Sequence, residues 1–145
     1  MPRYLPCLTH ANNRSLREKA YRAHVGRASS GEHDNRALIE EILALRGEQA
    51  TRLGYAHWAD VSLASKMAKD VDAVEGLLEE LRVAAFPAAE RELDDLRALA
   101  QRHGAAEAEE LAPWDLPYWS EKLRQERFDL DQEALRPWFP LPQVL

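Results

Sequence analysis

The sequence has a single cysteine and no long apolar run, and these two shortages exclude several classes of protein. Cys7 has no partner for an internal disulfide, so nothing in the chain requires an oxidising compartment. No stretch approaches the roughly 18 uninterrupted apolar residues that a membrane span needs. The start, with prolines at Pro2 and Pro6, lacks the apolar core of a secretory signal. We therefore expect a cytoplasmic protein without a membrane partner.

Positively charged residues are also fewer than negatively charged ones. The 145 residues contain 19 lysines and arginines against 25 aspartates and glutamates, a formal net charge of −6. A surface that binds nucleic acid needs the opposite balance, because it must neutralise phosphates. We therefore predict no nucleic-acid partner. The carboxylates occur in runs such as Glu79-Glu80, interspersed with arginines such as Arg82, which is typical of solvated helix faces.

Sequence signatures of catalysis are missing as well. None of the five histidines lies in a His-Glu-x-x-His or Glu-x-x-His motif, the spacings by which helices hold one or two metal ions. Cys7 and His10 are two possible metal ligands near the N-terminus, but no further ligands accompany them in the sequence. The six glycines never occur as Gly-x-Gly, and there is no Gly-x-Ser-x-Gly motif. We therefore predict no catalytic, cofactor-binding or metal-binding residue in this chain, and an enzyme based on Cys7 has almost no support.

Helical patterns, by contrast, are abundant, and no stretch alternates between apolar and polar residues as a strand would. We predict an all-α fold, an antiparallel helical array with one long kinked helix and little or no sheet. The first dozen residues are expected to be extended because of their prolines. Asn12-Asn13 predicts the start of a helix over residues 14–29, with a buried stripe at Leu16, Ala20 and Ala23.

The middle of the chain has clear helix boundaries. Apolar residues recur at helical spacing from Leu38 to Leu53, and Gly54 stands where a left-handed residue ends a helix. A brief helix is predicted over residues 56–67.

A long helical pattern follows the central region. Asp70 or Asp72 is expected to cap it, and it continues to Gly104. Pro87 lies in its middle and predicts either a kink or a break into two helices, because proline removes a backbone donor and clashes with the preceding turn.

The C-terminal part is rich in aromatic residues. A helix is predicted over residues 113–127 and one further helical turn over 129–135. Six of the eleven aromatic residues lie here, namely Trp114, Tyr118, Trp119, Phe128, Trp138 and Phe139. Such rings can form a core between the last helices, or an interface with something outside this chain. The candidate interface residues are Trp114, Tyr118, Trp119, Trp138 and Phe139.

Several runs of residues share an order and spacing with one known family. They are Asn12–Ala23, Asp34-Asn35 before Leu38–Arg46, Leu53–Tyr55, Ser62–Ala68, Pro113–Lys122, Glu126–Phe128 and Leu135–Pro140. Over almost the whole chain these runs resemble the thimet oligopeptidase and oligopeptidase A family of zinc metallopeptidases, and most closely its bacterial oligopeptidase A branch. The departures are Trp119 and Trp138, where relatives mostly have tyrosine, and Pro117, where a non-proline residue is usual.

The resemblance implies that residues 1–145 form a single helical segment of a larger metallopeptidase, ending before the zinc-binding helix. In intact relatives this region is part of the wall of a deep channel that admits short peptides. The His-Glu-x-x-His helix, the third zinc-binding glutamate and the substrate-binding tyrosine and histidine lie beyond this segment. No catalytic role therefore transfers to this chain, and zinc belongs to the intact parent enzyme.

Two functions remain open at this stage. The first is a fragment of an oligopeptidase A-like zinc metalloendopeptidase, inactive alone, whose partners are the missing catalytic half and, in the intact enzyme, short peptides. It predicts a partly uncovered aromatic end at Trp114, Tyr118, Trp138 and Phe139, and possible self-association through that end. The alternative is a stand-alone helical protein-interaction module, in which the same rings are covered internally or by a symmetric partner.

Overall fold

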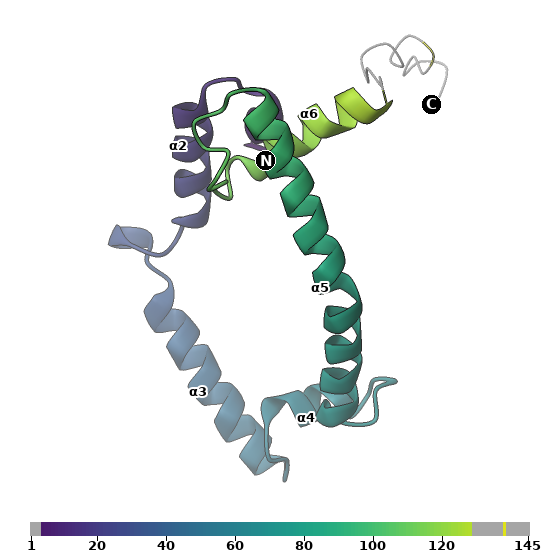
Figure 1. Ribbon diagram of the computed structural model, residues 1–145. Helices are drawn as coiled ribbons and strands as arrows, with labels where there is room; N and C mark the ends of the chain where they lie inside the picture. Colours follow the sequence, from purple (N-terminus) through teal and green to yellow (C-terminus); the bar gives the residue numbers. More distant parts are fainter. Residues whose placement is uncertain (1–3, 129–137, 139–145) are drawn as a thin grey trace. The chain divides into compact units, whose positions relative to one another are not determined.

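The computed structural model describes residues 4–128 and 138, and its regular structure is helical (Figure 1). The elements are α1 (Tyr4–His10), α2 (Arg14–Val25), a 3-10 turn (Gly31–His33), α3 (Arg36–Arg52), α4 (Trp58–Leu63), α5 (Val71–Arg102) and α6 (Leu116–Phe128). No strand occurs in this part of the chain, and the all-α prediction is confirmed. The helical turn predicted over 129–135 lies outside the described residues.

Helix α1 shows that the prediction of an extended N-terminal segment is wrong. Pro6 is the third residue of this helix, where the backbone N–H has no partner within the helix, so the missing donor costs nothing. The hydroxyl of Thr9 also donates a hydrogen bond to the carbonyl of Leu5 at 2.9 Å. Pro6 is therefore compatible with a helix at this position.

Helix α2 begins at the predicted cap but buries a different residue from the one expected. The side-chain oxygen of Asn13 accepts a hydrogen bond from the N–H of Leu16 at 3.1 Å. The helix ends at Val25, earlier than predicted. Leu16 is 50% exposed and Ala23 is exposed too, whereas Arg17 is only 1% exposed. The predicted apolar stripe is wrong at Leu16 and Ala23, because a charged side chain with polar partners occupies the buried face, whereas Ala20 is half-buried.

The predicted end of α3 is confirmed. Gly54 has a φ of +80°, and its N–H donates to the carbonyl of Thr51 at 3.1 Å. The N–H of Tyr55 donates to the carbonyl of Ala50 at 2.9 Å, which completes a Schellman motif. The following helix, α4, is shorter than predicted.

Helix α5 runs through Pro87 without interruption, so a break into two helices is the wrong alternative. Its start is capped by Asp70, whose carboxylate accepts a hydrogen bond from the N–H of Ala73 at 2.9 Å. It ends at Arg102, and Gly104 follows with a φ of +66°. Both boundaries agree with the sequence, because an Asp cap and a left-handed glycine are local signals.

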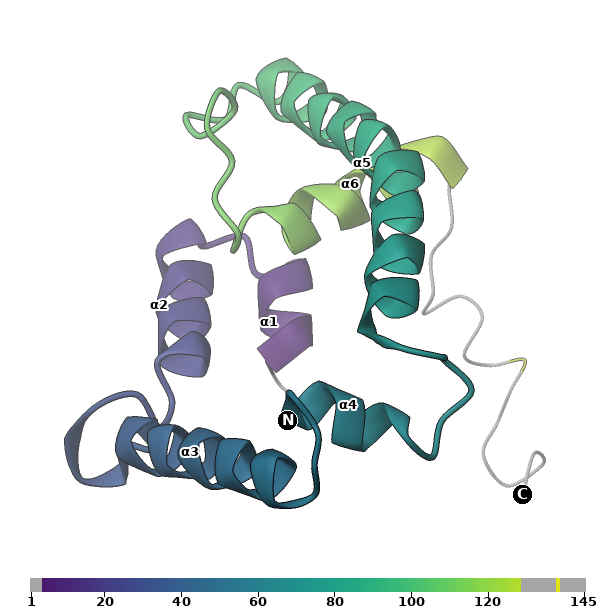
Figure 2. The same cartoon turned by 90° about the horizontal axis from the view of Figure 1, so that it is seen from below.

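The chain divides into two compact units, residues 1–25 with 92–145 (unit 1) and residues 26–91 (unit 2), so that α5 contributes to both. In unit 1, α1 packs against α2 and α6 (Figure 2). The hydrophobic core of this unit is formed by Leu96, Leu99, Ala100, Ala108 and Trp119. In unit 2, α3 contacts α4. No helix within residues 4–128 is long and apolar enough to cross a membrane.

Candidate functional site

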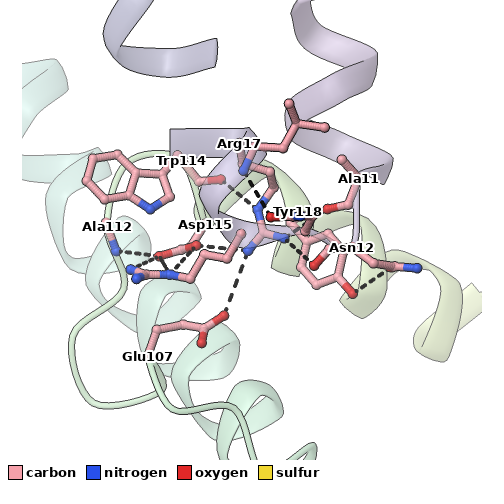
Figure 3. Close-up of polar contacts among 11 residues, drawn as sticks. Ala11, Asn12, Arg17, Glu107, Ala112, Trp114, Asp115 and Tyr118 are labelled. Carbon is pink, nitrogen blue, oxygen red and sulfur yellow. Dashed lines mark hydrogen bonds and ion pairs between the residues drawn. The ribbon is translucent and has the colours of Figure 1, made fainter. Parts of the chain in front are cut away.

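A fully buried ion pair lies in unit 1 (Figure 3). Arg17 on α2 and Asp115, directly before α6, are 1% and 0% exposed. The Nη2 of Arg17 donates a hydrogen bond to Oδ1 of Asp115 at 2.9 Å. Arg14, one turn earlier on α2, donates from Nε to Oδ1 at 3.0 Å and from Nη2 to Oδ2 at 2.8 Å. One carboxylate therefore compensates two guanidinium groups.

The other donors of Arg17 connect three separate parts of the chain. Nη1 donates to the carbonyl of Ala11 after α1 at 2.9 Å, and Nε donates to the carbonyl of Trp114 before α6 at 3.3 Å. The carboxylate of Glu107 lies 3.8 Å from Nη2, and the guanidinium lies 4.2 Å from the ring centroid of Tyr118. The arginine thus ties the end of α1 to the segment between α5 and α6.

The carboxyl group of Asp115 is held in its ionised form. Burial raises its pKa, but hydrogen bonds from Arg14, Arg17 and the backbone amide of Ala112 together outweigh burial, so the pKa lies below its ordinary value. The hydrogen bond from Arg14 to Asp115 in turn raises the pKa of that arginine. A carboxylate with a lowered pKa and both oxygens engaged is poorly suited to general acid or base catalysis. The arrangement instead fixes α6 against α1 and α2.

Two of the predicted interface residues lie beside this network. Trp114 is half-buried, with its ring centroid 5.7 Å from that of Tyr21 and 4.9 Å from the guanidinium of Arg22. Tyr118 is also half-buried, and its hydroxyl donates to the side-chain oxygen of Asn12 at 3.1 Å. Both aromatic residues therefore contact the N-terminal helices of the same unit.

The other predicted interface residues differ in their surroundings. Trp119 is 4% exposed and belongs to the core of unit 1, where it contacts Tyr118 edge to face at a centroid distance of 5.2 Å. Trp138 is 79% exposed. Phe139 lies outside the described residues. The structure thus brings Trp114, Tyr118 and Trp119 together, and the interface role of the whole set stays a prediction.

A cavity of about 250 Å³ lies between α5 and α6 in unit 1. Its lining residues are Glu92, Leu96, Ser120, Leu123, Arg124, Arg127 and Phe128. Arg124 is paired with Glu121, and Arg127 with Asp95. Both arginines at the cavity are therefore already engaged within the chain. No three histidine, cysteine, aspartate or glutamate side chains lie close enough to hold a metal ion in the described ranges, so these residues do not fit a zinc site.

Sequence reasoning missed the buried network because its partners are almost a hundred residues apart. Asp115 was part of the predicted helix start, and Arg17 stood in a pattern that favoured its apolar neighbours. The one available signal was the placement of two arginines one turn apart on a helix. Nothing in the sequence alone indicates which distant carboxylate binds them.

Comparison with known proteins assigns this helical segment to a family. The model of Peptidase family M3 matches residues 7–145. The chain belongs to peptidase family M3. This confirms the resemblance that the sequence runs predicted.

The similar M3 relatives include several oligopeptidases A. The chain is 50% identical to the probable cytosolic oligopeptidase A of Arabidopsis thaliana over 144 residues, covering 99% of this chain and 20% of that protein. It is 45% and 44% identical to the oligopeptidases A of Salmonella typhimurium and Escherichia coli over 145 residues, covering 97% of this chain and 21% of each. The chain thus spans about a fifth of the length of these relatives.

Proposed function

We propose that this chain serves as a helical, non-catalytic segment of an oligopeptidase A-like zinc metallopeptidase. The observation that carries the proposal is the identity of 44–50% over nearly the whole chain to relatives about five times its length. The described residues offer no ligand cluster for zinc, so no catalytic step is assigned to them. The zinc-activating groups and the zinc belong to the remaining part of the parent enzyme.

The role of the segment is to form part of the wall of the channel through which short peptides reach the zinc. The buried Arg17–Asp115 pair supports this role, because it connects helices from both ends of the segment and fixes α6 in place. A wall that limits access must keep its shape, and buried, fully hydrogen-bonded polar groups help to specify one arrangement. A cytoplasmic location is also part of this proposal. Of two Arabidopsis thaliana relatives that are 50% identical to this chain, one is named cytosolic and the other organellar.

A segment exchange tests the proposal. In the chimera, residues 1–145 replace the corresponding part of the E. coli oligopeptidase A, to which this chain is 44% identical. The measurement is the zinc-dependent hydrolysis of short peptides by the purified chimera. The chain alone, with added zinc, is assayed in parallel. We expect the chimera to hydrolyse peptides, to lose activity with a chelator and to regain it with zinc, while the chain alone remains inactive.

Two results would contradict the proposal. The first is a folded chimera without peptidase activity, since a true wall segment at this identity should support the catalytic half. The second is chelator-sensitive hydrolysis by the chain alone, since it would place the chemistry within these 145 residues. A stand-alone interaction module, the alternative function, predicts the first of these results.

A further inference from the structure

Unit 2 has almost no hydrophobic core of its own. Of residues 26–91, only Ala50 is buried. The side chains of unit 2 would become more exposed, not less, if the rest of the chain were removed. Unit 2 by itself therefore buries no residue besides Ala50. Helices in water gain most of their stability by burying an apolar face against another element. Unit 2 therefore needs cover from outside residues 26–91.

Helix α3 presents an uncovered apolar stripe. Leu38, Ile42 and Leu45 follow one another at spacings of four and three residues, which places them on one face of the helix. Their exposed fractions are 56%, 47% and 55%. Ile39, 53% exposed, widens the same stripe. Four large aliphatic side chains on one helix are an apolar surface that a soluble protein normally covers.

The first half of α5 is apolar on opposite sides. Leu77 and Leu81, both 57% exposed, share one face. Phe86, 54% exposed, follows Leu77 by nine residues, and at about 100° per residue it points to the opposite side of the helix. A helix with apolar residues all round is typical of a buried element. This part of α5 therefore needs cover on more than one side.

We infer that the apolar faces of unit 2 (Leu38, Ile42, Leu45, Leu77, Leu81 and Phe86) are enclosed by the rest of the parent peptidase chain. The inference rests on the proposed function. The relatives extend over about four-fifths of their length beyond the matched segment, so a large body is available in the same polypeptide. A second copy fits less well, because a two-fold contact covers one patch per chain, whereas α5 needs cover on opposite sides.

The test introduces a charge at two of these positions in the chimera described above. The variants are Ile42→Asp and Phe86→Asp, and the matched controls place the same residue at polar, exposed positions of the same helices, Glu40→Asp and Glu80→Asp. The measurement is the fraction of peptidase activity that survives mild heating. We expect a loss of at least about tenfold for each apolar variant, because burying an unpaired carboxylate is costly, and no comparable loss for the controls.

The same four variants in the chain alone complete the design. Here Ile42→Asp and Phe86→Asp should leave helix content by circular dichroism unchanged, since both positions remain in water. An unaffected chimera would overturn the inference while leaving the proposed function intact. Equal destabilisation of the chain alone would also overturn the inference, because it would mean that the chain covers these faces itself.

A second copy as the occupant gives a different result. In that case the chain alone sediments as a dimer that Ile42→Asp dissociates, and the chimera tolerates the substitution, which would also overturn the inference. A chimera that shows no activity before any substitution would instead contradict the proposed function, and this inference with it.

Discussion

Replacing Asp115 by asparagine should destabilise unit 1 more than any conservative surface substitution. The carboxylate is 0% exposed, and it accepts hydrogen bonds from Arg14 and Arg17, the second of which is 1% exposed. Asparagine keeps the shape but removes the charge, and its amide nitrogen, which takes the place of one carboxylate oxygen, cannot accept a hydrogen bond. Leaving a buried charge without its partner costs about 3–5 kcal/mol. Only the carboxylate of Glu107, 3.8 Å from Arg17, remains to compensate it.

Urea unfolding followed by near-ultraviolet circular dichroism measures this change, because Trp114 and Trp119 lie in unit 1. With a slope of about 1–3 kcal/mol per molar urea, the midpoint should fall by about 1 M or more. The control is Asp34→Asn, which removes a partly exposed carboxylate that also binds an arginine through two donors, the exposed Arg36. Exposed ion pairs contribute little. Equal shifts for the two variants would refute the reasoning that burial makes the Asp115 pair important.

Three further predictions concern unit 1 and helix α5. The pKa of Asp115 in the folded chain lies below its ordinary value, so the unfolded chain binds that proton more tightly. The free energy of unfolding should therefore be highest near neutral pH and fall as the pH drops through about 4 and below. The variant Asp115→Asn should lose this part of the acid sensitivity. Gly104→Ala should lower the free energy of unfolding by about 1 kcal/mol, since the φ of Gly104 is +66°. Gly76→Ala, within α5, should instead raise it by roughly half as much or more. Equal effects in thermal melts would exclude backbone conformation as the cause. Trp119→Ala should cost about 3–5 kcal/mol in the same melts, and a loss below 1 kcal/mol would show that the ring is not part of a packed core.

Local signals in the sequence predicted helix boundaries well. Asp70 and Gly54 act through hydrogen bonds between residues three to five positions apart, so their roles can be recognised without knowledge of the fold. Pro6 misled the prediction because the effect of proline depends on its position in the helix, and that position is known only once the helix start is known. The outcome at Pro87 was open for a similar reason, since a single proline can be accommodated in a long helix.

Contacts between residues far apart in the chain could not be predicted from the sequence. Periodicity placed Leu16 on the buried face of α2, but the face is chosen by Arg17, which meets Asp115 only through the fold. The apolar spacing of α3 predicted the helix, yet unit 2 leaves Leu38 and Ile42 exposed. Amphipathic periodicity shows that a face requires cover, and it does not show which part of a protein covers it.

Hydrogen exchange at the backbone of α3 tests most directly whether the rest of the parent enzyme completes this segment. The measurement compares residues 36–52 in the chain alone with the same residues in the oligopeptidase A chimera. We expect rapid exchange in the chain alone, where only Ala50 of this helix is buried, and strong protection in the chimera. Protection that is already complete in a monomeric chain, or exchange that stays rapid in an active chimera, would contradict the account.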